Sequence, residues 1–134
     1  MYDENIISRM NDYLHKAAQA LASWLSVMLP KSGEDWWEEC VLSNLSYSQR
    51  ELIEKKGLSK LEELDLAALL RVANKSWYTM RGYAYLPTSE RECIRDMIGV
   101  RNNWAHVSAE LPGKDTIVSD IECLIRFFAQ MNRS

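Results

Sequence analysis

The chain has 134 residues, a length that suits one domain with a hydrophobic core and is short for two. Hydrophobic residues make up 47% of it and charged residues 26%, a composition that excludes an intrinsically disordered chain. The net charge of −3 gives no overall sign of nucleic-acid binding. The basic residues are concentrated, however. Residues 71–101 carry six Lys and Arg against three Asp and Glu, whereas residues 1–70 carry seven against twelve. This local excess favours an anionic ligand.

The three cysteines, Cys40, Cys93 and Cys123, are an odd set without C-x-x-C spacing, and the chain has two histidines. Neither a disulfide framework nor a zinc site is expected, and we predict no metal or other cofactor. All three cysteines occupy apolar helical positions, which is typical of reduced core residues in a cytoplasmic protein. The N-terminus lacks the features of a signal peptide, and no apolar run is long enough to cross a membrane.

The first predicted element is a long amphipathic helix. Apolar residues recur at spacings of three and four over residues 6–28, and Pro30 and Gly33 are expected to end the helix. Asp35 is expected to cap a second helix that runs towards residue 45.

Two leucine-bearing segments follow. Ser48 is expected to start a short helix, QRELIEKK, that Gly57 stops. An apolar ridge over residues 61–72 predicts a further helix. This helix is expected to break near Asn74 and to resume over residues 77–85.

The last two predicted helices are long. The sequence SERE at residues 89–92 matches a capping box, in which Ser89 bonds a backbone N–H and Glu92 reaches back. The helix that it opens is expected to run to about His106, and a final helix covers residues 117–131.

No segment shows the alternation of apolar and polar residues that is typical of a strand. We therefore predict an all-α protein, a bundle of about five helices, with residues 1–134 forming a single domain. The long helices are expected to share one core, and its central residues are Trp24, Leu69, Met97 and Phe128.

The helix ending in RNNWAH carries an unusual polar stripe. Arg95, Gly99, Asn102 and His106 recur at helical spacing on one side, while Arg101 lies at the edge of the apolar side. A glycine within a helix costs about 1 kcal/mol relative to alanine, so Gly99 indicates close approach of another backbone. We predict that Gly99 and Arg95 belong to a twofold dimer interface.

Arg101 and His106 are five residues apart, which places them about 140° apart around an ideal helix. They can act together only if the helix ends between them or if a second copy completes the site. A purely structural interpretation also fits. A histidine after a helix often contacts terminal carbonyls, and an arginine at a core edge often lays its stem on apolar surface.

The pattern Arg101, Asn102, three residues and His106 resembles the R-N-x3-H motif of the HEPN superfamily. The aliphatic run before it and the terminal helix after a Pro-Gly loop fit the same family. DWWEECV (35–41) and LDLAALLRV (64–72) resemble one subgroup. That subgroup accompanies bacterial helicase or ATPase modules and occurs in a eukaryotic nuclear RNA-surveillance endonuclease.

The resemblance implies a homodimeric, metal-independent endoribonuclease that uses the ribose 2′-OH as nucleophile. In that role His106 would transfer protons, Arg101 would stabilise phosphate charge, and Asn102 would orient the imidazole or the phosphate. Expected roles are in toxin–antitoxin, anti-phage or RNA-processing systems, and expected partners are RNA and either an antitoxin or an associated helicase/ATPase. Basic residues that could contact the RNA backbone are Arg71, Lys75, Arg81, Arg91 and Arg95.

A non-enzymatic function is the alternative: a dimerisation or docking module of a larger nucleic-acid-processing protein. His15 has no recognisable catalytic partner and is expected on the surface or between helices. Trp36 and Trp37 could stack bases, although aromatic residues that pack helices are commoner.

Overall fold

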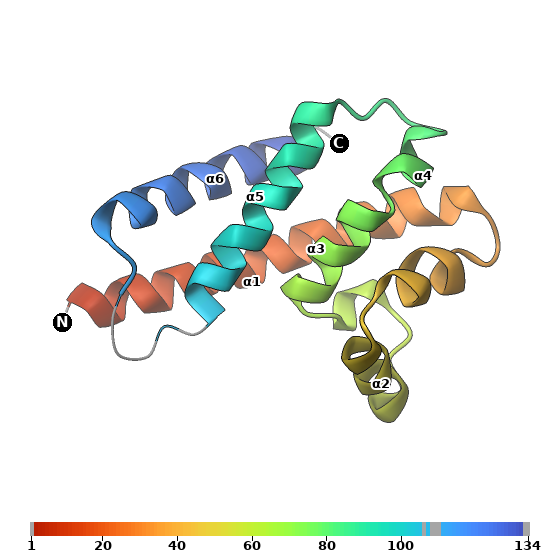
Figure 1. Ribbon diagram of the computed structural model, residues 1–134, viewed down its shortest axis with the longest axis horizontal. Helices are drawn as coiled ribbons and strands as arrows, with labels where there is room; N and C mark the ends of the chain where they lie inside the picture. Colours follow the sequence, from red (N-terminus) through yellow and green to blue (C-terminus); the bar gives the residue numbers. More distant parts are fainter. Residues whose placement is uncertain (1, 106, 108–110, 133–134) are drawn as a thin grey trace.

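The computed structural model describes residues 2–105, 107 and 111–132, and every regular element within them is helical (Figure 1). The α-helices are α1 (Tyr2–Met28), α2 (Tyr47–Lys56), α3 (Leu66–Lys75), α4 (Trp77–Arg81), α5 (Thr88–Ala105) and α6 (Lys114–Asn132). A π-helical turn, η2 (Trp37–Val41), and three 3-10 turns, η1 (Leu29–Ser32), η3 (Leu42–Asn44) and η4 (Leu61–Glu63), connect them. The prediction of an all-α bundle is confirmed.

Helices α1, α3, α5 and α6 share one core, and α1 runs along the length of the molecule (Figure 1). Trp24, Leu69 and Met97 are buried in this core, as predicted. Phe128 is only half-buried, whereas its neighbour Phe127 is fully buried. The expected core position on α6 was therefore wrong by one residue, because Phe127 continues the buried side of α6 that Cys123 and Leu124 begin.

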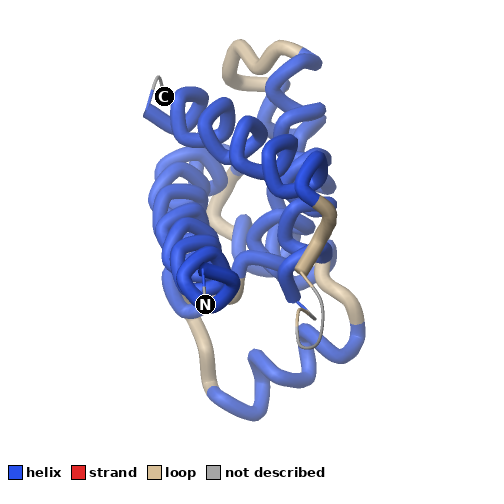
Figure 2. Tube along the Cα trace, turned by 90° about the vertical axis from the view of Figure 1, so that its left-hand side faces the viewer, coloured by secondary structure: helices blue, strands red, loops and turns tan. Residues whose placement is uncertain are grey.

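Helix α2 stands away from the bundle in both views (Figures 1 and 2). A capping box starts it one residue after Ser46: the Ser46 hydroxyl accepts from the Gln49 backbone N–H, and the Gln49 side chain accepts from the Ser46 backbone N–H. The predicted start at Ser48 was two residues late. Gly57 ends the helix as predicted, with a φ of 64°, a left-handed conformation that favours glycine.

The segment after α1 differs from the expected second helix. It forms the π-helical turn η2 and the 3-10 turn η3, and Asp35 contributes its backbone carbonyl rather than a side-chain cap. The Cys40 carbonyl accepts hydrogen bonds from the side chains of Asn44 (2.8 Å) and Ser76 (3.1 Å). Side-chain donors thus occupy a carbonyl that a continuing α-helix would use.

The start of α5 also lies earlier than predicted. The helix begins at Thr88, and the Glu90 N–H donates to the Pro87 carbonyl (3.0 Å). Ser89 is therefore inside the first turn rather than at the cap, because Pro87, which has no N–H to leave unpaired, occupies the helix entrance.

The three cysteines are free and buried. Burial, with smaller contributions from neighbouring charges, raises the pKa of the Cys123 thiol to about 11, so this thiol stays protonated at neutral pH.

No helix in the described part of the chain combines the length and apolar character that crossing a membrane requires.

Leu69→Ala tests the position of the core. Leu69 is 0% exposed, and truncating it leaves a cavity among α1, α3 and α5, so we expect the free energy of unfolding to fall by about 2–5 kcal/mol in urea titration. Leu52→Ala on α2 is the matched control. Leu52 is 47% exposed, and this substitution should change stability far less. Equal losses in the two variants would contradict the core assignment.

Candidate functional site

The last turn of α5 is attached to α6 by one buried carboxylate. Asp120 is 5% exposed, and its Oδ2 accepts from Trp104 Nε1 (2.8 Å) and from Asn103 Nδ2 (3.1 Å). Both donors belong to RNNWAH. Two residues of that stretch, Asn103 and Trp104, therefore orient the helix end through this carboxylate.

The other side of the same turn carries the predicted catalytic pair. Arg101 is half-buried, Asn102 is exposed, and Arg101 Nη1 lies 3.4 Å from the Asn102 Oδ1 that accepts from it. Ala105 is the last residue of α5. His106, the third predicted catalytic residue, follows Ala105 directly in the sequence and lies outside the described residues.

A small basic cavity opens between α3 and α5 beside this pair. Its volume is about 210 Å³, and Gln49 of α2 closes one side. It brings together four residues that the sequence suggested separately: Arg71 and Lys75 from α3, and Arg101 and Asn102 from α5. No Asp or Glu is among its lining residues. The arrangement provides a positive site next to the Arg101–Asn102 pair, suited to a phosphate group.

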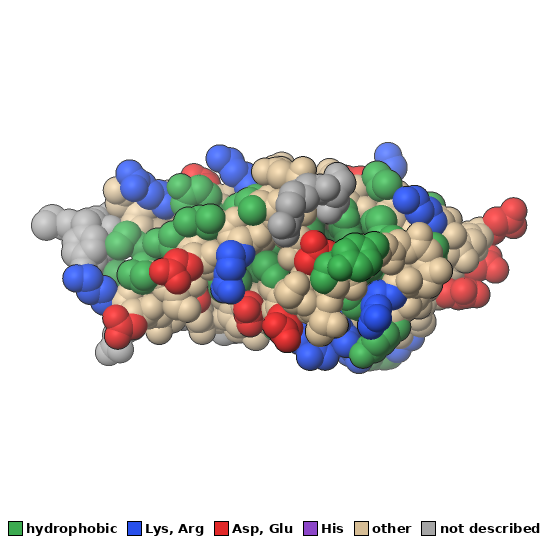
Figure 3. Space-filling model, turned by 90° about the horizontal axis from the view of Figure 1, so that it is seen from above, with side chains coloured by type: hydrophobic (Ala, Val, Ile, Leu, Met, Phe, Trp, Pro, Cys, Tyr) green, Lys and Arg blue, Asp and Glu red, His purple; other side chains and the backbone are tan. Residues whose placement is uncertain are grey.

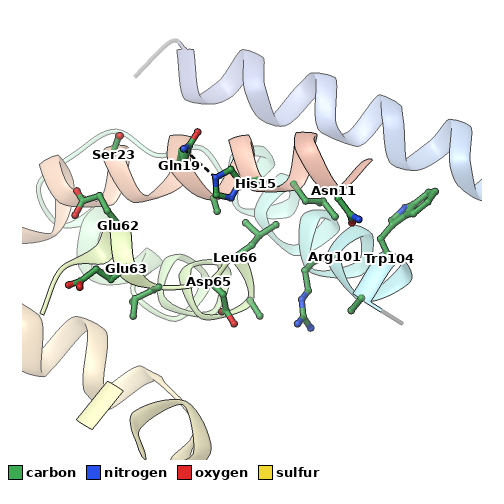
Figure 4. Close-up of a pocket in the computed structure, with 15 residues that line it drawn as sticks. Asn11, His15, Gln19, Ser23, Glu62, Glu63, Asp65, Leu66, Arg101 and Trp104 are labelled. Atoms are coloured by element: carbon green, nitrogen blue, oxygen red, sulfur yellow. Dashed lines mark hydrogen bonds between the residues drawn. The ribbon is translucent and has the colours of Figure 1, made fainter. Parts of the chain in front are cut away.

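A larger cavity of about 810 Å³ lies on the other side of Arg101, between α1, the start of α3 and the end of α5 (Figure 4). Glu62, Glu63 and Asp65 line it, so it carries negative charge. His15 projects from α1 into this cavity and lies 3.4 Å from the Gln19 amide. Of the two predicted placements of His15, on the surface or between helices, its exposure agrees with the first. That His15 shares a cavity with Arg101 could not be predicted from the sequence.

Two further predicted RNA contacts converge on Asn74. The Asn74 side-chain oxygen accepts from Arg91 Nε (3.2 Å) and from Arg95 Nε (3.4 Å), and Arg91 Nη2 also donates to the Asn74 backbone carbonyl (3.3 Å). Two guanidinium groups thus meet at a neutral oxygen. The sequence pattern at Asn74 indicates only a helix break. Its organising role depends on α3 and α5 packing side by side, which the sequence alone does not show.

Arg71 has a structural contact of its own. Its Nε donates to the Asn44 backbone carbonyl at 2.7 Å, which ties α3 to η3. The side chain still lines the basic cavity. Arg71 therefore has two roles, in holding the fold and in providing charge.

The predicted interface residues lie on the surface. Gly99 and Arg95 are exposed, and a Cβ built on Gly99 would meet no atom within 4 Å. No contact within the described chain explains why a glycine occupies this position, and the dimer interface stays a prediction.

Among the described residues, no group of three or more His, Cys, Asp and Glu is placed to hold a metal ion.

Asp120→Ala tests the attachment of the α5 end. It leaves the buried Trp104 N–H without its acceptor, and we expect a loss of about 1–3 kcal/mol in the free energy of unfolding, measured by denaturant titration. Asp115→Ala, an exposed aspartate at the start of the same helix, is the control and should cost less. An Asp120→Ala variant as stable as the unmodified protein would contradict the assignment.

Comparison with known proteins identifies the family. The family model described as Swt1-like HEPN matches residues 11–127, a range that includes Arg101, Asn102 and His106. No curated protein and no solved structure matches the chain. The match covers most of the sequence, and it agrees with an all-helical fold. The chain belongs to the Swt1-like HEPN family, and so to a superfamily that is in general RNA-related.

Proposed function

We propose that this protein is a metal-independent endoribonuclease of the HEPN type that acts as a homodimer. One observation carries the proposal. The Arg101–Asn102 pair lies in the last part of α5 and lines a basic cavity, and His106 follows Asn102 by four residues in the sequence. The site thus combines phosphate-binding charge with a residue type that exchanges protons near neutral pH.

The reaction needs no nucleophile from the protein. The ribose 2′-oxygen attacks the adjacent phosphorus, the new P–O2′ bond forms, and the P–O5′ bond breaks. His106 accepts the 2′-OH proton, and a protonated His106 of the second copy gives a proton to the leaving 5′-oxygen. Arg101 stabilises charge on the non-bridging oxygens. The products are a 2′,3′-cyclic phosphate and a 5′-hydroxyl.

The proposed dimer is supported by the needs of the reaction. The reaction needs one group that accepts a proton and another that donates one, and each chain has a single His106, so a second copy is the simplest source of the second histidine. Gly99 is exposed on α5, and the space around it is open.

The proposed location is the cytoplasm, because three buried free cysteines suit a reducing compartment. An antitoxin or a helicase/ATPase as partner, in toxin–antitoxin, phage-defence or RNA-processing systems, extends this proposal.

The catalytic residues are tested by substitution. His106→Ala should reduce RNA cleavage about 10²–10⁴-fold, because the proton-transfer group is lost. Arg101→Ala should be comparably damaging, and Arg101→Lys should restore activity only in part, because an ammonium keeps the charge and loses the planar fork. The assay uses purified protein and mixed RNA in the presence of EDTA, which should leave the rate unchanged.

His15→Ala is the matched control, since His15 is the other histidine of the chain, and it should cleave RNA at the unmodified rate. Full activity in His106→Ala, or no cleavage by the unmodified protein at micromolar concentration, would overturn the proposal.

Gly99→Leu tests the dimer. A leucine side chain would block close approach of a second α5, so sedimentation should show a shift to monomer without loss of helicity by circular dichroism. Ser119→Leu adds a leucine at an exposed position of α6 and should leave the dimer intact. A Gly99→Leu protein that stays dimeric would contradict an interface at this glycine.

A non-catalytic docking module is the second candidate. Val118, Ile121 and Ile125 lie on one side of α6 and are exposed. Apolar side chains form a band over the part of the molecule where α6 lies, on the surface seen from above (Figure 3). Such a stripe is typical of protein contacts. Cleavage that depends on His106 would decide between the two candidates.

A further inference from the structure

Tyr78 is an exposed aromatic residue flanked by cations. It lies on α4 and is 66% exposed, so most of its surface faces solvent. The Arg91 guanidinium carbon lies 4.7 Å from the centre of its ring, and that of Arg81 lies 5.9 Å away. An accessible ring beside two positive charges is the combination that single-stranded nucleic acids bind, because the charges attract phosphates and the ring stacks on a base.

The ring is connected to the candidate active site through Asn74. This residue holds Arg91, which covers Tyr78, and it also lines the basic cavity that contains Arg101. A basic strip therefore joins the end of α5 to α4 across α3. Its members are Arg101, Asn102, Arg71, Lys75, Asn74, Arg95, Arg91, Arg81 and Tyr78.

The charges around Arg101 decide which way a phosphate chain would run. Towards α1, the larger cavity is lined by Glu62, Glu63 and Asp65 and would repel phosphates. Towards α3, the smaller cavity is lined by Arg71 and Lys75, without a carboxylate. The favourable direction from Arg101 is along the basic strip to Tyr78.

We propose that single-stranded RNA follows the basic strip from Arg101 and stacks one of its bases on Tyr78. The inference rests on the proposed function, which supplies RNA as the substrate. Arg101 and Arg91 are ten residues apart on α5, about 15 Å along the helix, so the stacked base lies a few nucleotides from the reacting phosphate. Bases inside a duplex are already stacked and do not reach the ring. Stacking tolerates any base, so the strip selects unpaired RNA without selecting a sequence.

Binding is measured with a probe that cannot be cleaved: a short single-stranded 2′-O-methyl RNA, labelled for fluorescence anisotropy and carrying 2-aminopurine. Tyr78→Ala and Tyr78→Leu should weaken binding about 5- to 150-fold, whereas Tyr78→Phe, which keeps the ring, should bind as the unmodified protein does. The fluorescence of the probe's 2-aminopurine should be quenched when the unmodified protein or Tyr78→Phe binds the probe. It should not be quenched by Tyr78→Ala or Tyr78→Leu.

Tyr85→Ala is the control, because Tyr85 is 89% exposed in the loop after α4, and it should bind the probe normally. Tyr78→Leu keeps an apolar side chain of similar bulk. If this variant loses binding of the probe while its melting temperature is unchanged, the loss is due to the missing ring and not to a change in the fold. Equal binding by all variants, equal losses in Tyr78→Ala and Tyr85→Ala, or no binding by the unmodified protein would overturn the inference. If the unmodified protein cleaves RNA but its binding of the probe does not depend on Tyr78, the stacking site is rejected and the nuclease proposal stands. If binding depends on Tyr78 but the protein does not cleave RNA, the nuclease proposal is rejected and the stacking site stands.

Discussion

The hydrogen bonds of Asp120 fix the part of the structure on which the candidate site depends. A buried carboxylate that accepts from a tryptophan and an asparagine one residue apart sets both the position and the rotation of the α5 end. On an ideal helix Asn102 points about 160° away from Trp104, so attaching Trp104 to α6 turns Asn102 outwards. The RNNWAH stretch thus has two functions: Asn103 and Trp104 hold it, and Arg101 and Asn102 present polar groups beside α3.

The packing of α3 on α5 then determines the electrostatics. Arg71 and Lys75 would be ordinary solvated cations on an isolated helix. Beside α5 they share a cavity with Arg101. The Asn74 side chain of α3 also accepts hydrogen bonds from Arg91 and Arg95 of α5. Acidic residues around η4 face the opposite cavity. An overall negative chain therefore has a positive surface where the candidate chemistry lies, which the net charge of −3 conceals.

Helical periodicity predicted the fold because a continuous apolar side is a strong local signal, as α1 shows. It failed where side-chain donors replace backbone hydrogen bonds, as at Cys40, or where two adjacent phenylalanines compete for one core position, as on α6. The motif singles out Arg101 and Asn102, whose catalytic role stays a prediction, but it does not predict the hydrogen bond between them. Asp120 was missed, although a lone aspartate in the apolar series of α6 is a detectable signal. Asn74 could not be found, since its role arises from contacts between helices far apart in sequence.

The chemistry of the cleaved ends tests the central claim most directly. A strand with a single ribonucleotide in an otherwise 2′-deoxy chain offers one internal nucleophile. The mechanism predicts cleavage only after that ribonucleotide, with a 2′,3′-cyclic phosphate on one fragment and a 5′-hydroxyl on the other, and no cleavage of the fully 2′-deoxy strand. Ends carrying a 5′-phosphate, or cleavage where the 2′-OH is missing, would contradict a reaction driven by the substrate's own hydroxyl.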